Sequence, residues 1–260
     1  MKKLSRGPII FLIILTLLNY LPIILTVVYS FNASKITSVW GGLSLTWYRQ
    51  LLNDNDLKKS LINSLIVAFF TCNFAVIIGT SAAIAMRNTK LWIDNVISYF
   101  STLPIMIPEI ILGMLFMAIF SFINLPFGFV TLIIAHTSFC IPYVFLLVRA
   151  RLVGMDPSYE EAAKDLGAST FQTFRDIIFP YILPGILSGV LLSFAMSFDD
   201  VVISIFTTGP TVNTLAIKIY TKMKTGVTPE INALATIILI ITMISVILYE
   251  LVNRKNITKI

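Results

Sequence analysis

Six long apolar stretches constrain this chain more than any other feature of its sequence. Each has about 20 or more residues, which is enough for a helix to cross the hydrocarbon core of a bilayer. They cover approximately residues 8–30, 61–86, 96–120, 128–148, 181–206 and 231–252. The sequence therefore predicts an all-α integral membrane protein, with six transmembrane helices in a single domain over residues 1–260.

The composition excludes the soluble alternatives. Only 12% of the 260 residues are charged and 57% are hydrophobic, whereas a soluble domain has about 25% charged residues. Too little polar surface is available to cover a water-soluble protein of this size, so a soluble enzyme, a nucleic-acid-binding protein and a disordered chain are excluded. Both cysteines, Cys72 and Cys140, fall in apolar stretches and indicate neither a disulfide nor a metal site.

The distribution of basic residues predicts the orientation. Six spans place both termini on one side of the membrane, and that side receives twelve of the 19 Lys and Arg residues. By the positive-inside rule, both termini are expected to be cytoplasmic, and the net charge of +6 reflects orientation rather than nucleic-acid binding. The first stretch is too long for the apolar region of a signal peptide and is expected to be retained.

The segment between the fourth and fifth stretches has clear helix boundaries. Asp156 followed by proline is a good helix start, and Gly167 is a good stop because the residue after a helix often needs a positive φ. Either Ser169 or Thr170 can cap a second helix, which is expected to end before Pro180.

The first of these two helices is amphipathic. Its apolar residues recur at i, i+3, i+4 and i+7, and its acidic residues lie away from that face. The apolar residues are Tyr159, Ala162, Ala163 and Leu166, and the acidic ones are Glu160, Glu161 and Asp165. A helix this short needs a surface to pack on. Docking to a partner is favoured over packing on its own bundle or on an anionic lipid surface.

These residues carry a resemblance to a known family. The segment 161–180 resembles the EAA loop of ABC importer permeases. It has Glu161-Ala162-Ala163, then three residues, Gly167, nine residues and Ile177-Ile178-Phe179-Pro180. It departs from the pattern only at Phe179, where Leu is usual. The resemblance assigns residues 156–180 to a cytoplasmic coupling loop that docks into an ATPase subunit. It implies that the coupling residues are Tyr159, Glu161, Ala162, Ala163, Leu166 and Gly167.

The resemblance extends over nearly the whole chain. Residues 45–48, 197–204, 208–210 and 226–236 resemble PotC-type permease subunits of spermidine/putrescine importers. This implies a type I ABC importer permease (MetI-like) fold that carries polyamines. It also implies a second homologous permease, two ATP-binding cassette ATPase subunits and an extracytoplasmic polyamine-binding protein. ATP is then used by the ATPase subunits, and this chain binds no cofactor.

Three carboxylates inside the stretches independently favour a cationic solute. Glu109, Asp199 and Asp200 each carry the cost of an acid within a membrane, and no Lys or Arg lies mid-span to neutralise them. An amine passing through can supply the missing charge. The alternative is a salt bridge to the partner permease. Ser197, three residues before Asp200, is expected to share this substrate path, and the resemblance adds a cation–π contact at Trp47.

The fifth stretch also carries small residues four apart, at Gly185, Gly189, Ser193 and Ser197. Close helix packing is the simpler interpretation of the two glycines. Asp200 continues the stripe beyond Ser197 and is expected to face the path. Asp199 points about 100° away on a straight helix, so the two acids do not face the same lumen.

Two other residues have a simple structural interpretation. His136, the single histidine, is interpreted as a hydrogen-bonded packing residue rather than a proton relay. Trp47 shares a helical face with Leu51, either as an interfacial anchor or as a lip of the substrate path.

No nucleotide-binding loop, metal motif or nucleophile elbow appears in the sequence. The chain is therefore predicted not to be an enzyme, and no metal ligands are assigned. Two alternatives remain. One is an importer of another cationic or amino-acid-like solute. The other is an ion-coupled secondary transporter that uses Glu109 or His136, although no inverted repeat supports it.

Overall fold

The computed structural model describes residues 6–36, 39–88, 91–224, 226 and 228–257. Within these ranges the regular structure is helical, apart from one isolated bridge between Asn32 and Leu43. The expected all-α class is therefore confirmed. Some basic residues that were counted for orientation lie outside the described residues: Lys2, Lys3, Lys90 and Lys259.

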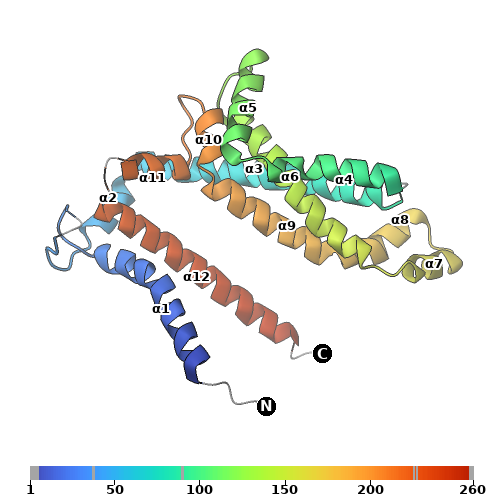
Figure 1. Ribbon diagram of the computed structural model, residues 1–260, viewed down its shortest axis with the longest axis horizontal. Helices are drawn as coiled ribbons and strands as arrows, with labels where there is room; N and C mark the ends of the chain where they lie inside the picture. Colours follow the sequence, from blue (N-terminus) through green and yellow to red (C-terminus); the bar gives the residue numbers. More distant parts are fainter. Residues whose placement is uncertain (1–5, 37–38, 89–90, 225, 227, 258–260) are drawn as a thin grey trace. The chain divides into compact units, whose positions relative to one another are not determined.

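The chain divides into two compact units, residues 1–57 with 219–260, and residues 58–218. In the first unit, α1 (Arg6–Tyr29) lies along α12 (Pro229–Ile257), and α2 (Thr46–Asn53) also packs on α12 (Figure 1). Trp47 and Leu51, predicted to share a face of α2, are both buried. Two helices, α3 (Asn55–Ala85) and α11 (Leu215–Lys224), cross the boundary between the units.

The second unit holds the remaining helices. In chain order they are η1 (Met86–Asn88), α4 (Leu91–Met106), α5 (Glu109–Phe122), α6 (Phe129–Val153), α7 (Ser158–Asp165), α8 (Thr170–Thr173), the π-helix η2 (Phe174–Ile178), α9 (Phe179–Asp199) and α10 (Val202–Thr207). Figure 1 shows α7 and α8 at one end of this unit and α5 with α10 at the other. The loop expected to couple to an ATPase is thus well separated from the carboxylates at Glu109 and Asp200.

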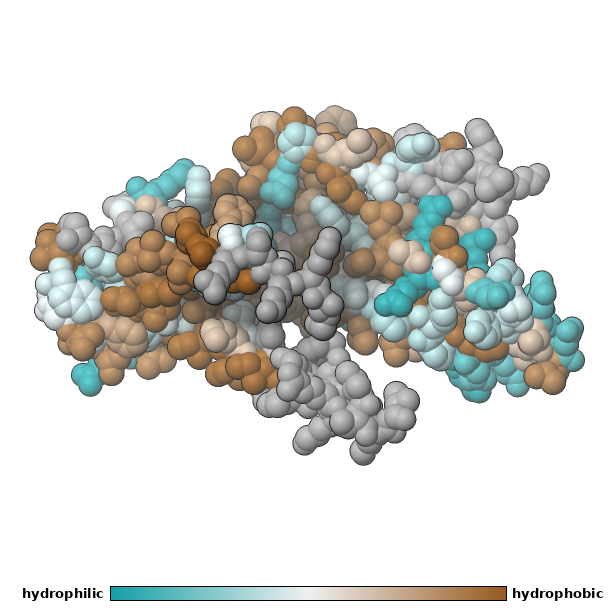
Figure 2. All heavy atoms as spheres, turned by 60° about the horizontal axis from the view of Figure 1, so that its bottom comes forward, coloured by the Kyte–Doolittle hydropathy of each residue, from teal (hydrophilic) through white to brown (hydrophobic). Residues whose placement is uncertain are grey.

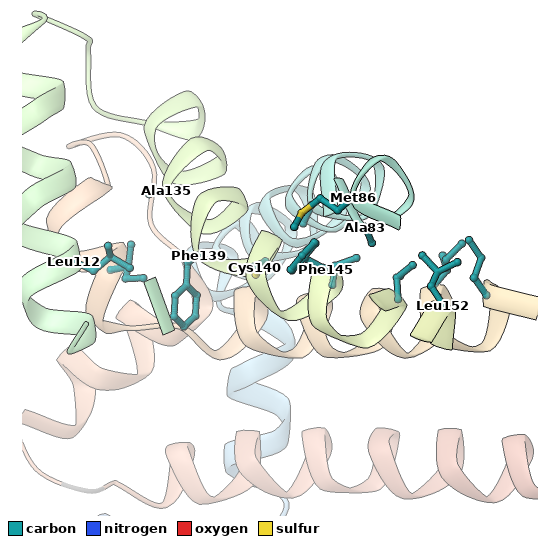
Figure 3. Packing of buried hydrophobic residues seen from close by; sticks show 14 of the residues in the cluster. Ala83, Met86, Leu112, Ala135, Phe139, Cys140, Phe145 and Leu152 are labelled. Carbon is teal, nitrogen blue, oxygen red and sulfur yellow. The ribbon is translucent and has the colours of Figure 1, made fainter. Parts of the chain in front are cut away.

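The core of the second unit forms where α6 packs along α9. Figure 3 shows Cys140, Phe145 and Leu152 of α6 in one buried cluster with Ala83 and with Met86, which follows α3. On α9, the small-residue stripe allows this close approach. A Cβ at Gly185 would lie 3.0 Å from the Leu147 carbonyl oxygen, closer than ordinary van der Waals contact.

Gly189 is also tightly packed, because a Cβ there would lie 3.2 Å from Val144 Cγ1. Ser193 and Ser197 continue the stripe and are buried. The packing interpretation of the two glycines is confirmed, and it extends along the helix to both serines.

Within the part of the chain that the structure describes, four helices are long and apolar enough to cross a membrane: Gly7–Tyr29, Asn55–Ala85, Phe129–Val153 and Thr170–Asp199. Two shorter apolar helices, Glu109–Phe122 and Pro229–Ile244, accompany them among the described residues. Figure 2 shows apolar side chains over much of the visible face and polar ones at the end that carries α7 and α8. The polar side chains at this end fit an α7–α8 loop that lies in water.

Two predicted spans are not single helices. The stretch 96–120 is divided between α4 and α5, because Pro108 has no N–H to continue the helix and precedes the first residue of α5. The stretch 181–206 is divided at Asp200, whose backbone is extended at ψ 126°. Hydropathy is continuous across both breaks, so the apolar pattern alone did not show them.

The expectation that the second loop helix ends before Pro180 was wrong. α8 continues through η2 into α9, and together they form the apolar helix Thr170–Asp199. In the π-helical turn, the Phe179 N–H bonds the Phe174 carbonyl five residues back. Pro180 then falls in the first turn of α9, where a missing N–H costs little.

Candidate substrate path and coupling helix

The helix α7 begins and ends as its sequence predicted. Asp156 Oδ1 accepts a hydrogen bond of 2.9 Å from the Ser158 N–H, and this bond helps to hold the pKa of the Asp156 carboxyl below its ordinary value. At the other end, Gly167 has a φ of +81°. The N–H groups of Gly167 and Ala168 bond the carbonyls of Lys164 and Ala163, both at 2.9 Å. This is a Schellman motif, which satisfies the last carbonyls of the helix.

Ser169, rather than Thr170, caps the next helix. Its Oγ accepts a hydrogen bond from the Gln172 N–H at 3.3 Å, and its own N–H donates to Gln172 Oε1 at 2.8 Å. This capping box satisfies two helix-end donors at once and fixes the direction in which the chain leaves α7.

The apolar face of α7 is divided between the protein and its surroundings. Ala163 is buried against its own chain, whereas Leu166 is 89% exposed and Tyr159 is 57% exposed. Glu160 lies on the buried side, where it forms a half-buried ion pair with Arg87 of η1. Its partner explains why this acid is not on the outer face.

The outward face of α7 therefore combines apolar and acidic side chains. Glu161, Ala162, Asp165 and Leu166 are exposed there. On a helix with about 100° per residue these four lie within one arc of about 140°. Such a narrow apolar ridge flanked by carboxylates suits a groove with basic residues at its rim.

At the other end of the unit, a buried polar network surrounds His136. Its Nδ1 lies 2.8 Å from Ser197 Oγ, and its Nε2 lies 3.0 Å from Ser204 Oγ and 3.3 Å from Asp200 Oδ2. The side chains of His136 and Asp200 are only 2% and 7% exposed. His136 is thus a hydrogen-bonded packing residue, as predicted, and it supplies the partner for Asp200 that the sequence did not reveal.

Asp200 also begins the helix α10. Its Oδ2 accepts a 2.7 Å hydrogen bond from the Ser204 N–H, and its Oδ1 accepts one of 3.3 Å from the Ile203 N–H. These bonds satisfy amides that have no partner within the helix. Both carboxylate oxygens therefore have partners inside the chain.

The other two intramembrane acids are exposed. Glu109 is the first residue of α5, directly after Pro108, where the positive end of the helix dipole favours a carboxylate. Asp199 is the last residue of α9 and is exposed, while its neighbour Asp200 turns inward. The two adjacent acids therefore point in different directions, as predicted, but the extended backbone at Asp200 separates them rather than the turn of a straight helix.

Trp47 lies within the packing of the first unit. It is 6% exposed, and its Nε1–H donates to the Asn32 carbonyl at 2.7 Å. The Asn32 side chain orders the loop before α2: its Oδ1 accepts from the Gly41 N–H at 2.8 Å and its Nδ2 donates to the Val39 carbonyl at 2.8 Å. The structure thus places Trp47 as a support of this loop, with little of its ring open to a solute.

A cluster that the sequence analysis missed joins α11 to two other segments of the first unit. Lys222 Nζ lies 2.6 Å from Glu230 Oε1 and 3.2 Å from Asp54 Oδ2. Burial lowers the pKa of Lys222, but hydrogen bonds and charge attraction from Glu230 and Asp54 outweigh it and raise that pKa above its ordinary value. Lys222 and Asp54 are separated by 168 positions in the sequence, which explains why no sequence pattern indicated this cluster.

Among the described residues, no three His, Cys, Asp or Glu side chains come together as metal ligands would. Glu109 and Asp199 each expose a carboxylate that can attract a cation, and the outward face of α7 exposes apolar and acidic side chains.

The fold is similar to that of chains in two solved ABC transporters. The chain is similar to a solved structure of a bacterial ABC transporter involved in the import of the acidic polysaccharide alginate, with a TM-score of 0.72 and 16% identity over 98% of this chain and 99% of that one. It is also similar to an amino acid ABC transporter, with a TM-score of 0.61 and 19% identity over 80% of this chain and 98% of that one.

Residues 75–258 match the family of binding-protein-dependent transport system inner membrane components, and the chain belongs to that family. It is 40% identical to the spermidine/putrescine transport system permease protein PotC of Haemophilus influenzae, over 91% of this chain and 92% of that protein. It is also 40% identical to the putrescine transport system permease protein PotI of Escherichia coli K12, over 85% of this chain and 81% of that protein. The chain is thus a multi-pass inner-membrane transport component.

Proposed function

We propose that this chain is a transmembrane permease subunit of an ATP-driven importer that carries the polyamines spermidine and putrescine across the bacterial cytoplasmic membrane. The observation that carries this proposal is the 40% identity to two polyamine permeases over most of the chain. The exposed carboxylates at Glu109 and Asp199 agree with a cationic cargo, because an acid at the membrane level needs a counter-charge or water.

The proposed topology has six membrane crossings. The third combines α4 and α5 on either side of Pro108, and the fifth is α9, followed by the short α10. Broken helices are tolerated at membrane depth where protein or a polar path satisfies the freed backbone groups. Both termini and the α7–α8 loop then lie in the cytoplasm, in agreement with the excess of Lys and Arg on that side.

The partners follow from this assignment. A second homologous permease covers one side of the path, two ATP-binding cassette subunits bind at the cytoplasmic face, and an extracytoplasmic protein delivers the polyamine. ATP is bound and hydrolysed by the ATPase subunits, and this chain holds no cofactor of its own. Membrane lipid covers the remaining apolar surface, such as the exposed face of α1.

In the proposed mechanism, α7 docks into the ATPase through Glu161, Ala162 and Leu166 on its outward face, with Tyr159 beside them. Ala163 and Gly167 have a different role, because one packs α7 on its own chain and the other ends it sharply. Movement of the ATPase then moves α7 as a rigid body and shifts the helices attached to it.

Within the path, we assign the direct contacts with the amine to Glu109 and Asp199. Trp47, Ser197 and Asp200 have their polar atoms engaged inside the chain, so their contribution to the path is to hold its walls. This division follows from exposure: a carboxylate with free surface can bind a passing ammonium, whereas a buried and bonded one cannot without breaking its own contacts.

ATP hydrolysis by the reconstituted complex tests the assignment. We expect binding protein loaded with spermidine or putrescine to stimulate hydrolysis well above the rate seen with unloaded binding protein. Arginine, which is also cationic, serves as the comparison solute. Stimulation by arginine but not by either polyamine would contradict the proposed cargo while leaving the transporter class intact.

A further inference from the structure

The helix α10 is attached to α6 at both of its ends. At its start, His136 of α6 contacts Asp200 and Ser204. At its end, Thr131 Oγ1 donates a 2.7 Å hydrogen bond to the Thr207 carbonyl. A helix of six residues has no stability of its own, so these attachments determine where it lies.

The attachment at the start depends on a complementary pair. When Asp200 is ionised it only accepts hydrogen bonds, so its pairing with His136 requires a proton on Nε2. The Nδ1 atom is held by Ser197, which fixes the ring orientation. Because both side chains are almost fully buried, removing either one deprives the other of one of its buried polar contacts.

From α10, the contacts continue to α5. The two helices pack so closely at Gly113 that a Cβ there would lie 2.5 Å from Phe206 Cδ2 and 3.4 Å from the Ile203 Cα. Gly113 lies four residues after Glu109, on the same face of α5. A shift of α10 must therefore move the start of α5, where the Glu109 carboxylate is exposed.

We propose that His136 and Asp200 form a latch that positions the Glu109 carboxylate in the substrate path. The latch acts through α10 and Gly113, and its two residues are positioning residues rather than contacts for the solute. The role of Glu109 as a contact rests on the proposed function, but the mechanical link from Asp200 to Glu109 does not.

The link is tested by the reactivity of a cysteine at position 109. A Glu109→Cys form of the assembled complex is treated with a maleimide, alone and combined with Asp200→Asn, His136→Leu or His136→Gln. Both native cysteines, Cys72 and Cys140, are buried and contribute little background. The matched control is Ser138→Ala. Among the described residues, the hydrogen bond of the Ser138 hydroxyl is donated to the Ile134 carbonyl of its own helix.

We expect Asp200→Asn and His136→Leu each to change the labelling rate at position 109 by several-fold. Ser138→Ala is expected to leave it unchanged, and His136→Gln, which keeps a side-chain donor, to fall between. Recovery of the partner subunits with each variant establishes that the complex has assembled. Equal labelling rates in all assembled variants would overturn the latch, and if His136→Leu does not assemble, the Asp200→Asn and His136→Gln rates decide.

Spermidine uptake separates the latch from direct binding by Asp200. Since the two residues act as one unit, we expect the double variant His136→Leu with Asp200→Asn to transport no more slowly than either single variant, each of which loses about tenfold or more. Multiplicative losses would contradict the latch and assign Asp200 an independent contact. If the wild-type complex transports no spermidine, the proposed function fails, and the labelling experiment still decides the latch.

Discussion

A Leu166→Glu variant is expected to lose coupling between ATP hydrolysis and transport. Leu166 is 89% exposed at the end of α7, and an apolar side chain so exposed on a short helix gains its stabilisation from a partner. Placing a carboxylate in that docking groove is expected to weaken ATPase binding by about 30-fold or more, the size of a typical interface hot spot. Recovery of the ATPase with the purified permease measures the loss directly.

The matched variants define what such a result means. Leu166→Met conserves volume and apolarity, so it is expected to retain the ATPase. Glu161→Lys reverses a charge on the same outward face and is expected to fail, whereas Glu161→Gln is expected to be milder. Normal ATPase recovery and normal stimulation in both Leu166→Glu and Glu161→Lys would show that α7 is not the docking element.

A Glu109→Gln variant is expected to separate hydrolysis from transport in a different way. The glutamine keeps the size of the side chain but removes the charge that meets the amine. With the docking helix intact, hydrolysis stimulated by loaded binding protein is expected to persist, while the rate of spermidine uptake falls about tenfold or more. The quantity to measure is the number of ATP molecules hydrolysed for each spermidine imported, which is expected to rise.

Glu109→Asp is the control for this variant, since it keeps the charge at the same helix N-terminus. It is expected to retain most of the uptake. An Asp199→Asn variant is expected to lower uptake in the same manner as Glu109→Gln, because it removes the second exposed acid. Unchanged uptake in both neutral variants would move the cation contacts away from these residues and leave them as contacts with the partner permease.

The local features of the coupling loop were predictable because their causes are local. The hydrogen bond of Asp156, the positive φ of Gly167 and the cap at Ser169 each depend on residues within a few positions in the sequence. Capping and turn preferences act over that distance, so the pattern contains nearly all the information required.

The features that the sequence did not reveal depend on distant residues or on continuous hydropathy. His136 and Asp200 are 64 residues apart, and only the packing of α6 on α9 and α10 brings them together. The break at Asp200 and the passage of a helix through Pro180 both lie inside apolar stretches, where hydropathy does not distinguish a continuous helix from a broken one. Asp200 and Ser197 face inward because both contact His136, which is distant in the sequence.

The central claim, a polyamine permease driven by a separate ATPase, is tested most directly by uptake of labelled spermidine. The vesicles contain the complete complex and its binding protein, and ATP is supplied on the side of the ATPase subunits. We expect spermidine uptake that requires ATP and is inhibited by unlabelled putrescine. The Leu166→Glu variant is expected to lose this uptake, and the Leu166→Met variant to retain it. Vesicles with a verified intact complex that accumulate no spermidine with ATP would contradict the central claim.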